Sequence, residues 1–253
     1  MKAFVLAEPG KVKWFDAPEP QLVPYGAILK PVAVTPCSSD VHTVFGGGSK
    51  KQDNLVLGHE CIAEVVSVGE NVCDFKTGDR VAVPAITPDW REKSIQEGND
   101  RHASAPFSGH QLGRTQPGVF SERFLIKDAD TTLAHIPQKI SEEQALMSVD
   151  VVTTGFTGAE YADIKIGDTV CVIGIGPIGL MAVAGAKLRG AARIIAVGTR
   201  PKCVQLAKYY GATDVLSYKE GDIVQQVKEL TNGIGVRSEE RRVGKECRSR
   251  WSP

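Results

Sequence analysis

The 253-residue chain lacks several features that define large classes of protein. No window approaches the roughly 18 consecutive apolar residues that a membrane span needs, so we predict that this is not a membrane protein. The N-terminal apolar stretch is short and ends at Glu8 and Pro9, which indicates no signal peptide and a cytoplasmic location. The six cysteines contain no C-x-x-C pair, so we expect reduced thiols rather than a disulfide framework.

The chain also lacks net charge, because 30 basic and 30 acidic side chains cancel. This balance argues against a general polyanion-binding protein. The charges are distributed unevenly: residues 237–253 carry six basic and three acidic side chains, whereas residues 1–236 carry 24 and 27. Residues 237–253 (RSEERRVGKECRSRWSP) have no hydrophobic periodicity and resemble the in-frame translation of a sequencing adapter, so we interpret them as a non-native tail. The alternative interpretation is a basic tail that binds nucleic acid or a partner.

Up to about residue 150, short apolar runs separated by Gly, Pro and Asp predict an all-β domain. The runs are rich in Val and Ile and alternate in part; they cover 27–37, 61–69, 79–86 and 121–127. This pattern favours a partly closed barrel. Residues 88–118 are polar and rich in Gly and Pro, which predicts a long surface excursion of the kind that is often functional.

From Ser141 onward the pattern changes to alternating strands and helices. Ser141 and Gln144 have the spacing of a capping box at a helix start. Apolar runs predict buried strands at 169–174 and 193–198, and 214–218 is predicted as a third, short strand. Helical segments are predicted at 179–189, 201–210 and 221–231. Alternation of this kind indicates βαβ units and a parallel sheet.

The turn after the first of these strands reads G-I-G-P-I-G, between a predicted strand and a predicted helix. Its glycines permit a tight turn and close backbone approach, so a pyrophosphate can lie against the N–H groups at the helix start. We therefore predict a dinucleotide site; a structural turn without a ligand is the alternative. The residues predicted to form it are Gly174, Gly176, Pro177, Ile178 and Gly179.

The end of the second strand lacks the Asp or Glu that holds the ribose 2′-hydroxyl in NAD-binding proteins. Gly198, Thr199 and Arg200 stand there instead. Arg200 can pair bidentately with a 2′-phosphate, and Thr199 can donate a hydrogen bond to it. The sequence therefore favours NADP, although Arg200 could merely cap a surface helix.

Three side chains of the first region suggest a metal site. Cys37 ends an apolar strand, His59 begins another, and Asp150 lies in an apolar stretch where an unpaired carboxylate would be costly. Cysteine, histidine and carboxylate suit a zinc ion with three protein ligands and an open fourth position. Taken alone, the spacing leaves open that the cysteine is simply buried and the histidine structural.

Four segments resemble the zinc-dependent medium-chain alcohol dehydrogenases, and more specifically their NADP-dependent secondary-alcohol subgroup. They are PCSSDVHTVFGG, LGHECIAEVVSVG, DRVAVPAITPDWR and VCVIGIGPIGLMAVAGAKLRGAARIIAVGTR. The resemblance runs from Met1 to about Val236. It implies a GroES-like β-barrel catalytic domain over residues 1–150 and a Rossmann NADP-binding domain over residues 151–236, with residues 237–253 outside both.

The same resemblance implies a role for each site residue. Cys37, His59 and Asp150 would hold one catalytic zinc, with Glu60 as a nearby, exchangeable ligand. Ser39 and His42 would form the proton path. Without the family resemblance, His42 would be interpreted as a solvated loop histidine. The adenosine 2′-phosphate would be bound by Thr199, Arg200 and Tyr218. The implied reaction is reversible oxidation of a small secondary alcohol to a ketone in a homotetramer.

Two departures from the family pattern qualify these expectations. Residues 88–118 contain no cysteine, so no structural zinc is expected, and this absence is shared with the subgroup. His110 stands where close relatives tend to have Trp, which leaves the preferred alcohol open. A zinc-free NADPH quinone or enone reductase of the same superfamily is the alternative function.

The nucleotide domain is expected to be incomplete. Residues 151–236 supply only three of the six strands of a full dinucleotide-binding sheet. We therefore predict that the strand at 169–174 becomes an exposed apolar edge and that the chain as written is inactive.

Overall fold

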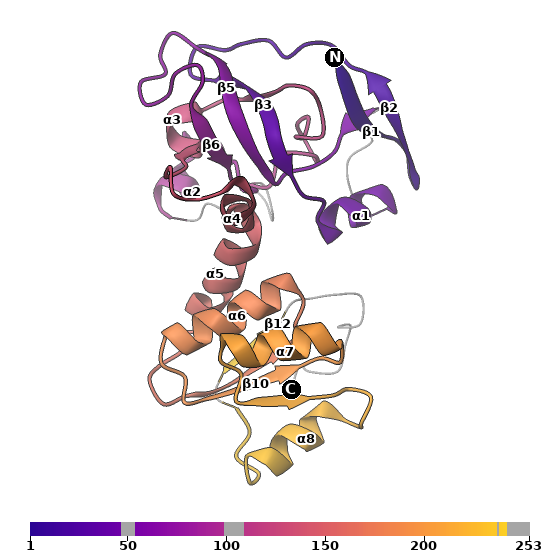
Figure 1. The fold of residues 1–253 in the computed structure, drawn as a ribbon, viewed down its shortest axis with the longest axis vertical. Helices are drawn as coiled ribbons and strands as arrows, with labels where there is room; N and C mark the ends of the chain where they lie inside the picture. Colours follow the sequence, from indigo (N-terminus) through magenta and orange to yellow (C-terminus); the bar gives the residue numbers. More distant parts are fainter. Residues whose placement is uncertain (47–53, 99–108, 237, 242–253) are drawn as a thin grey trace. The chain divides into compact units, whose positions relative to one another are not determined.

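The computed structural model describes residues 1–46, 54–98, 109–236 and 238–241 (Figure 1). The chain divides into two compact units, Met1–Asp150 and Val151–Pro253. Each unit contains its own hydrophobic core, so the two are described separately.

Two antiparallel sheets build the first unit. The larger has the strand order β7-β3-β5-β6-β8, with β3 (Ala27–Val34), β5 (Cys61–Val68), β6 (Arg80–Val83), β7 (Phe124–Ile126) and β8 (Ala134–His135). The smaller places β1 (Lys2–Glu8) between β2 (Lys11–Asp16) and β4 (Leu55–Val56). The predicted strands therefore form, while β1, β2, β4 and β8 were not predicted.

Alternating apolar residues explain the larger sheet. Successive side chains of a strand point to opposite faces, so Leu29 and Val65, paired across β3 and β5, are buried together. They belong to a core that is filled mainly by Val, Ile, Leu and Phe side chains. Its fully or almost fully buried members include Leu29, Val65, Val81, Val83, Leu112, Val119 and Phe124.

The pairing of β3 with β5 brings distant parts of the sequence together. Val34 at the end of β3 lies opposite Cys61 at the start of β5. The Thr35 N–H then donates a hydrogen bond to the Glu60 carbonyl at 3.3 Å. The chain segments that precede β5 and follow β3 therefore leave the sheet at the same end.

Three short helices lie between these strands, and a fourth follows β8: α1 (Ser38–Val44), α2 (Lys93–Gln96), α3 (Ala129–Thr132) and α4 (Glu142–Met147). The capping box predicted at α4 is present, because Ser141 Oγ accepts from the Gln144 N–H at 3.3 Å and Gln144 Oε1 accepts from the Ser141 N–H at 3.1 Å. A π-helical turn, Ser148–Val152, follows α4. Of the predicted surface excursion, residues 99–108 lie outside the described residues.

The second unit is a parallel sheet with helices, as predicted. Its strands have the order β11-β10-β9-β12, with β9 (Thr169–Ile173), β10 (Arg193–Val197) and β11 (Asp214–Leu216) in register (Figure 1). The helices are α5 (Thr153–Tyr161), α6 (Pro177–Leu188), α7 (Pro201–Tyr210) and α8 (Ile223–Leu230). Both faces of the central strands are buried, because Val170 and Val172 belong to one core and Cys171 to another.

One prediction about this sheet was wrong. A fourth strand, β12 (Ser238–Arg241), pairs in parallel with β9, so that Ser238 lies opposite Val170 and Arg241 opposite Ile173. The strand predicted at 169–174 is therefore inside the sheet and not at an exposed edge. The unpaired N–H and C=O groups of an edge strand accept any extended segment, whatever its side chains, and a sequence pattern based on hydrophobicity does not reveal this.

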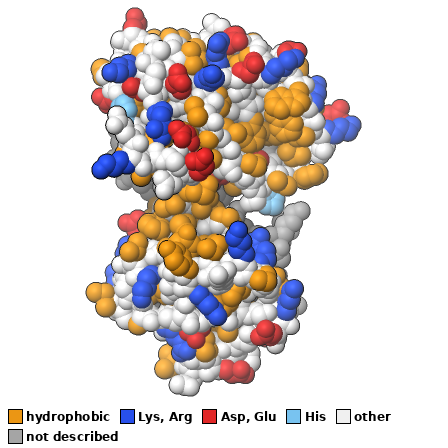
Figure 2. Space-filling view, in the orientation of Figure 1, with side chains coloured by type: hydrophobic (Ala, Val, Ile, Leu, Met, Phe, Trp, Pro, Cys, Tyr) orange, Lys and Arg blue, Asp and Glu red, His pale blue; other side chains and the backbone are white. Residues whose placement is uncertain are grey.

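Charged side chains of both signs are intermingled on the face of the molecule shown in Figure 2. This arrangement agrees with the equal numbers of basic and acidic residues in the sequence.

Candidate active site

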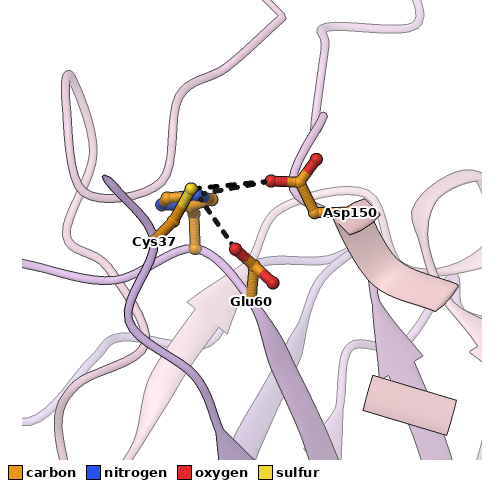
Figure 3. Close-up of side chains that lie close together, drawn as sticks. Cys37, Glu60 and Asp150 are labelled. Atoms are coloured by element: carbon orange, nitrogen blue, oxygen red, sulfur yellow. Dashed lines mark hydrogen bonds and ion pairs between the residues drawn. The ribbon is translucent and has the colours of Figure 1, made fainter. Parts of the chain in front are cut away.

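Four candidate metal ligands converge in the first unit. Cys37, His59, Glu60 and Asp150 each offer one ligand atom, and these atoms all lie within 4.8 Å of one another. Cys37 immediately precedes α1, His59 and Glu60 immediately precede β5, and Asp150 lies in the π-helical turn. Figure 3 shows Cys37, Glu60 and Asp150 pointing toward one another.

The distances within this cluster fit a shared cation. His59 Nε2 lies 3.7 Å from Glu60 Oε1 and 3.8 Å from Asp150 Oδ2, and Cys37 Sγ lies 4.0 Å from Asp150 Oδ2. Zinc–ligand bonds of about 2.0–2.3 Å place tetrahedral ligands roughly 3.3–3.8 Å apart. Glu60 Oε2 is buried and has no hydrogen-bond partner within the described part of the chain. Sulfur, imidazole and carboxylate donors around a buried space therefore suit zinc.

The helix start at Cys37 positions two of the ligands. The buried Asp40 accepts a hydrogen bond from the Cys37 N–H at 2.8 Å through Oδ2, and its Oδ1 lies 3.1 Å from His59 Nδ1. One carboxylate thus fixes the backbone of Cys37 and leaves Nε2 of His59 to face the cluster. Asp40 was not predicted as a site residue; its signal was an acidic residue three positions after Cys37, the spacing of a capping box.

Burial and mutual proximity shift the pKa values of the ionisable groups in this cluster. Burial and the nearby Asp150 and Cys37 raise the pKa of Glu60 to about 8. Burial alone would raise the pKa of Cys37, but hydrogen bonds with His59 and Ser39 lower it to about 7. Burial alone would lower the pKa of His59, but the carboxylates of Asp150 and Asp40 raise it to about 11. A divalent cation would replace the protons that hold these groups together.

Zinc binding should therefore release protons. Near pH 7, His59 is protonated, Glu60 largely so and Cys37 in part, whereas zinc needs all three deprotonated. We expect about two protons released per zinc at pH 7 and an affinity that rises with pH through the pKa values of Cys37 and Glu60 and on to that of His59, at about 11. Calorimetric titration in buffers of different ionisation enthalpy measures the number of protons released per zinc bound.

The Glu60→Gln variant serves as the matched control for this titration, because it removes one titrating group and should lower the number of released protons by nearly one. Zinc binding without net proton release at pH 7 would contradict the expectation.

The two predicted proton-path residues lie on α1 in different surroundings. Ser39 is half-buried, and its Oγ lies 3.2 Å from His59 Nε2. His42 lies three residues further along the same helix and is exposed. Side chains three residues apart on a helix are neighbours. The arrangement places Ser39 at the ligand cluster and His42 toward solvent, while a relay between them stays a prediction.

His110 also belongs to this site. Its ring meets the ring of His59 edge to face, with 4.5 Å between centroids. Burial and the positively charged His59 lower the pKa of His110 to about 4, so its imidazole is neutral at pH 7.

The glycine-rich turn of the second unit has the geometry predicted for it. Gly174 has a φ of +91°, and Gly176 caps α6, which begins at Pro177. A Cβ on Gly179 would lie 1.9 Å from the Gly174 carbonyl oxygen, so only glycine fits there. Ile178 is half-buried in the first turn of the helix. The free N–H groups at the start of α6 are available to a phosphate.

The residues predicted to select NADP gather at the ends of β10 and β11. Thr199 Oγ1 donates a hydrogen bond to Tyr218 Oη at 3.0 Å. The exposed Arg200 reaches the glycine turn, because its Nη2 lies 3.7 Å from the position that a Cβ on Gly176 would take. Arg200 is the N-cap residue of α7, where its guanidinium cannot accept a hydrogen bond from the free N–H groups of the helix, because it only donates. Its guanidinium thus remains available to a 2′-phosphate.

Comparison with known proteins places both units in established families. Residues 24–138 match the alcohol dehydrogenase GroES-like domain, and residues 177–239 match the zinc-binding dehydrogenase family. The NADP-dependent isopropanol dehydrogenase of Thermoanaerobacter brockii is 55% identical over 236 residues, covering 93% of this chain and 67% of the relative. The enzyme of the same name from Clostridium beijerinckii is 52% identical with the same coverage. The chain thus spans about two thirds of the length of these relatives.

Solved structures show the same fold. The zinc-dependent alcohol dehydrogenase 2 from Streptococcus pneumonia, in its apo form, aligns with a TM-score of 0.83 at 29% identity, covering 93% of this chain and 67% of that one. An NAD-dependent alcohol dehydrogenase aligns with a TM-score of 0.82 at 26% identity, covering 93% and 69%. Among the described residues, no helix has the length and apolar character to cross a membrane.

Proposed function

The chain belongs to the zinc-dependent medium-chain alcohol dehydrogenase family, and on that premise we propose that the full-length protein catalyses the reversible, NADP-dependent oxidation of a small secondary alcohol to a ketone. The observation that carries this proposal is the cluster of Cys37, His59, Glu60 and Asp150. A zinc-free reductase would have no use for that ligand set. The relatives that are 52–55% identical and act on isopropanol support the substrate class.

Residues of this chain would handle the proton and hold the reactants. Zinc, when bound, supplies a Lewis acid that lowers the pKa of an alcohol hydroxyl, and NADP⁺ supplies the hydride acceptor. Ser39 takes up the hydroxyl proton beside His59 and passes it through His42 to solvent. Asp40 keeps His59 in one orientation throughout. The glycine turn and Arg200 fix the position of the dinucleotide.

The proposal is tested by metal analysis together with a cofactor-dependent assay. The full-length protein should retain about one zinc per chain, since the family resemblance predicts no structural zinc, and it should oxidise 2-propanol with NADP⁺, whereas residues 1–253 alone are expected to be inactive. Removal of the metal with a chelator should abolish turnover, and added zinc should restore it. Turnover that persists without metal would favour the zinc-free reductase.

Replacing Arg200 by alanine should weaken NADP binding selectively. Loss of a charge-assisted, bidentate contact with the 2′-phosphate should raise the KM for NADP⁺ by about 10- to 100-fold and leave that for NAD⁺ nearly unchanged. Steady-state kinetics with both cofactors measures the difference. Lys202→Ala removes an equal charge from an exposed position on the same helix and serves as the control. An equal rise in KM for NADP⁺ and for NAD⁺ would contradict the assignment of Arg200 to the 2′-phosphate.

We further infer that the protein is a cytoplasmic homotetramer, as the resemblance to the secondary-alcohol dehydrogenases implies, and that it binds no nucleic acid, since the basic residues 237–253 are interpreted as a non-native tail. Sedimentation velocity at micromolar concentration distinguishes a tetramer from smaller assemblies.

A further inference from the structure

His110 carries a polar atom that the fold itself does not satisfy. Its Nε2 is buried and has no hydrogen-bond partner among the residues that the structure describes. Leaving a buried nitrogen unpaired costs free energy, and such groups are few in native proteins. The buried, unpaired Nε2 of His110 therefore indicates that a bound ligand supplies its hydrogen-bond partner.

The position of His110 connects this atom to the reaction site. The His110 ring packs edge to face on His59, 4.5 Å away between centroids. The Nε2 atom of that same His59 faces Ser39, Glu60 and Asp150. The His110 ring therefore lies against the imidazole whose Nε2 faces the cluster.

Neither metal ligation nor ring packing accounts for the unpaired nitrogen of His110. His110 is not part of the metal-ligating group, whose four ligand atoms lie within 4.8 Å of one another. Packing of the ring alone would be served equally by an aromatic side chain without a nitrogen. The nitrogen itself still needs a partner.

We propose that His110 Nε2 hydrogen-bonds a second oxygen of the substrate, so that the preferred substrates are vicinal diols and the corresponding α-hydroxy ketones. This inference rests on the proposed function, because the first oxygen is the one oxidised at the metal cluster. The proximity of His110 to His59 favours an oxygen on the adjacent carbon. In the reaction, the carbinol carbon gives a hydride to NADP⁺ and its hydroxyl gives a proton to Ser39, which yields the hydroxy ketone and NADPH. The second hydroxyl is unchanged.

The test compares 2,3-butanediol with 2-butanol, which differ by one hydroxyl on the same carbon skeleton. In the unmodified protein, the ratio of kcat/KM for the diol to kcat/KM for 2-butanol should be high. His110→Phe keeps a planar ring but removes the nitrogen, and it should lower this ratio about tenfold. His110→Gln restores a hydrogen-bonding group and should recover much of the ratio. An unchanged ratio in His110→Phe would overturn the proposal. So would a loss of bound zinc in this variant that lowers kcat/KM equally for the diol and for 2-butanol.

A binding measurement separates this proposal from the proposed function. In the zinc-loaded protein without NADP, the nitrogen-15 shift of His110 Nε2 should move when 2,3-butanediol is added and stay nearly constant with 2-butanol. Equal responses to the two compounds would overturn the inference. If the unmodified protein oxidised neither alcohol, the proposed function would fail, and this shift would still decide whether His110 recognises a diol.

Discussion

Replacing Cys37 by serine is expected to remove both the bound zinc and the catalytic activity. Cys37 supplies the only sulfur of the four-residue cluster, and a neutral serine hydroxyl is a far weaker zinc ligand than a thiolate. Because changes to residues that merely orient ligands cost 10- to 100-fold, loss of a ligand should lower kcat/KM for 2-propanol by more than about 100-fold. Zinc content by atomic emission and steady-state kinetics on the same sample measure the two effects.

The same variant should leave the helix start intact. Serine is a favourable N-cap residue, and the Asp40 carboxylate would still accept from the N–H at position 37. Circular dichroism and the unfolding midpoint should therefore change little. Cys73→Ser is the matched control, since Cys73 is exposed and lies outside the cluster. Full zinc content in Cys37→Ser would contradict the assignment of this residue as a ligand.

Replacing Gly179 by alanine is expected to destabilise the second unit and to abolish NADP binding. The added Cβ would lie 1.9 Å from the Gly174 carbonyl oxygen, and backbone cannot rotate away as a flexible side chain can. Opening the turn should cost roughly 1–3 kcal/mol of unfolding free energy or more. The displaced turn would no longer direct the N–H groups of α6 at a pyrophosphate. Urea denaturation and calorimetric NADP titration measure the two losses.

Gly176→Ala provides the contrast within the same turn. Its nearest described atom would be Arg200 Nη2 at 3.7 Å, which is ordinary van der Waals contact, so stability should fall only slightly. NADP should nevertheless bind more weakly, because the methyl group would stand where the pyrophosphate approaches the backbone. A Gly179→Ala protein as stable as the unmodified chain would show that the turn is more tolerant than its geometry indicates.

The elements that could be predicted were those whose signal is local. Continuous Val and Ile runs identified β9 and β10, and the Ser141–Gln144 pair identified the start of α4. The glycine turn was recognisable because two of its glycines meet a backbone requirement: Gly174 has a positive φ, and Gly179 lies too close to the Gly174 carbonyl for a Cβ. Burial on both faces of a strand requires a continuous apolar run, and helix capping requires particular residue types at a fixed spacing. Both patterns involve neighbouring residues and can be recognised in the sequence.

Features that depend on distant partners were missed. Asp40 acts through His59, nineteen residues away, and its sequence context shows only a helix start. The pairing of β12 with β9 rests on main-chain hydrogen bonds, which carry no side-chain signal.

The strand pair β1 and β2 was also missed, although it did have a local signal. Pro9 and Gly10 form a turn between alternating residues, with Gly10 at a φ of +78°.

The packing of Gly198 has a consequence for how cofactor preference changes during evolution. A Cβ at this position would approach Ile175 Cγ1 to 2.3 Å, so the residue that follows β10 is constrained by a residue of the glycine turn. An acidic residue that would recognise the ribose of NAD would overlap Ile175 in its present position, so Ile175 has to shift or be shortened to admit it. For a lineage that changes from NADP to NAD through this position, shortening the side chain at position 175 first avoids the overlap. Sterics therefore favour that order of the two mutations, and the reverse order passes through a strained intermediate.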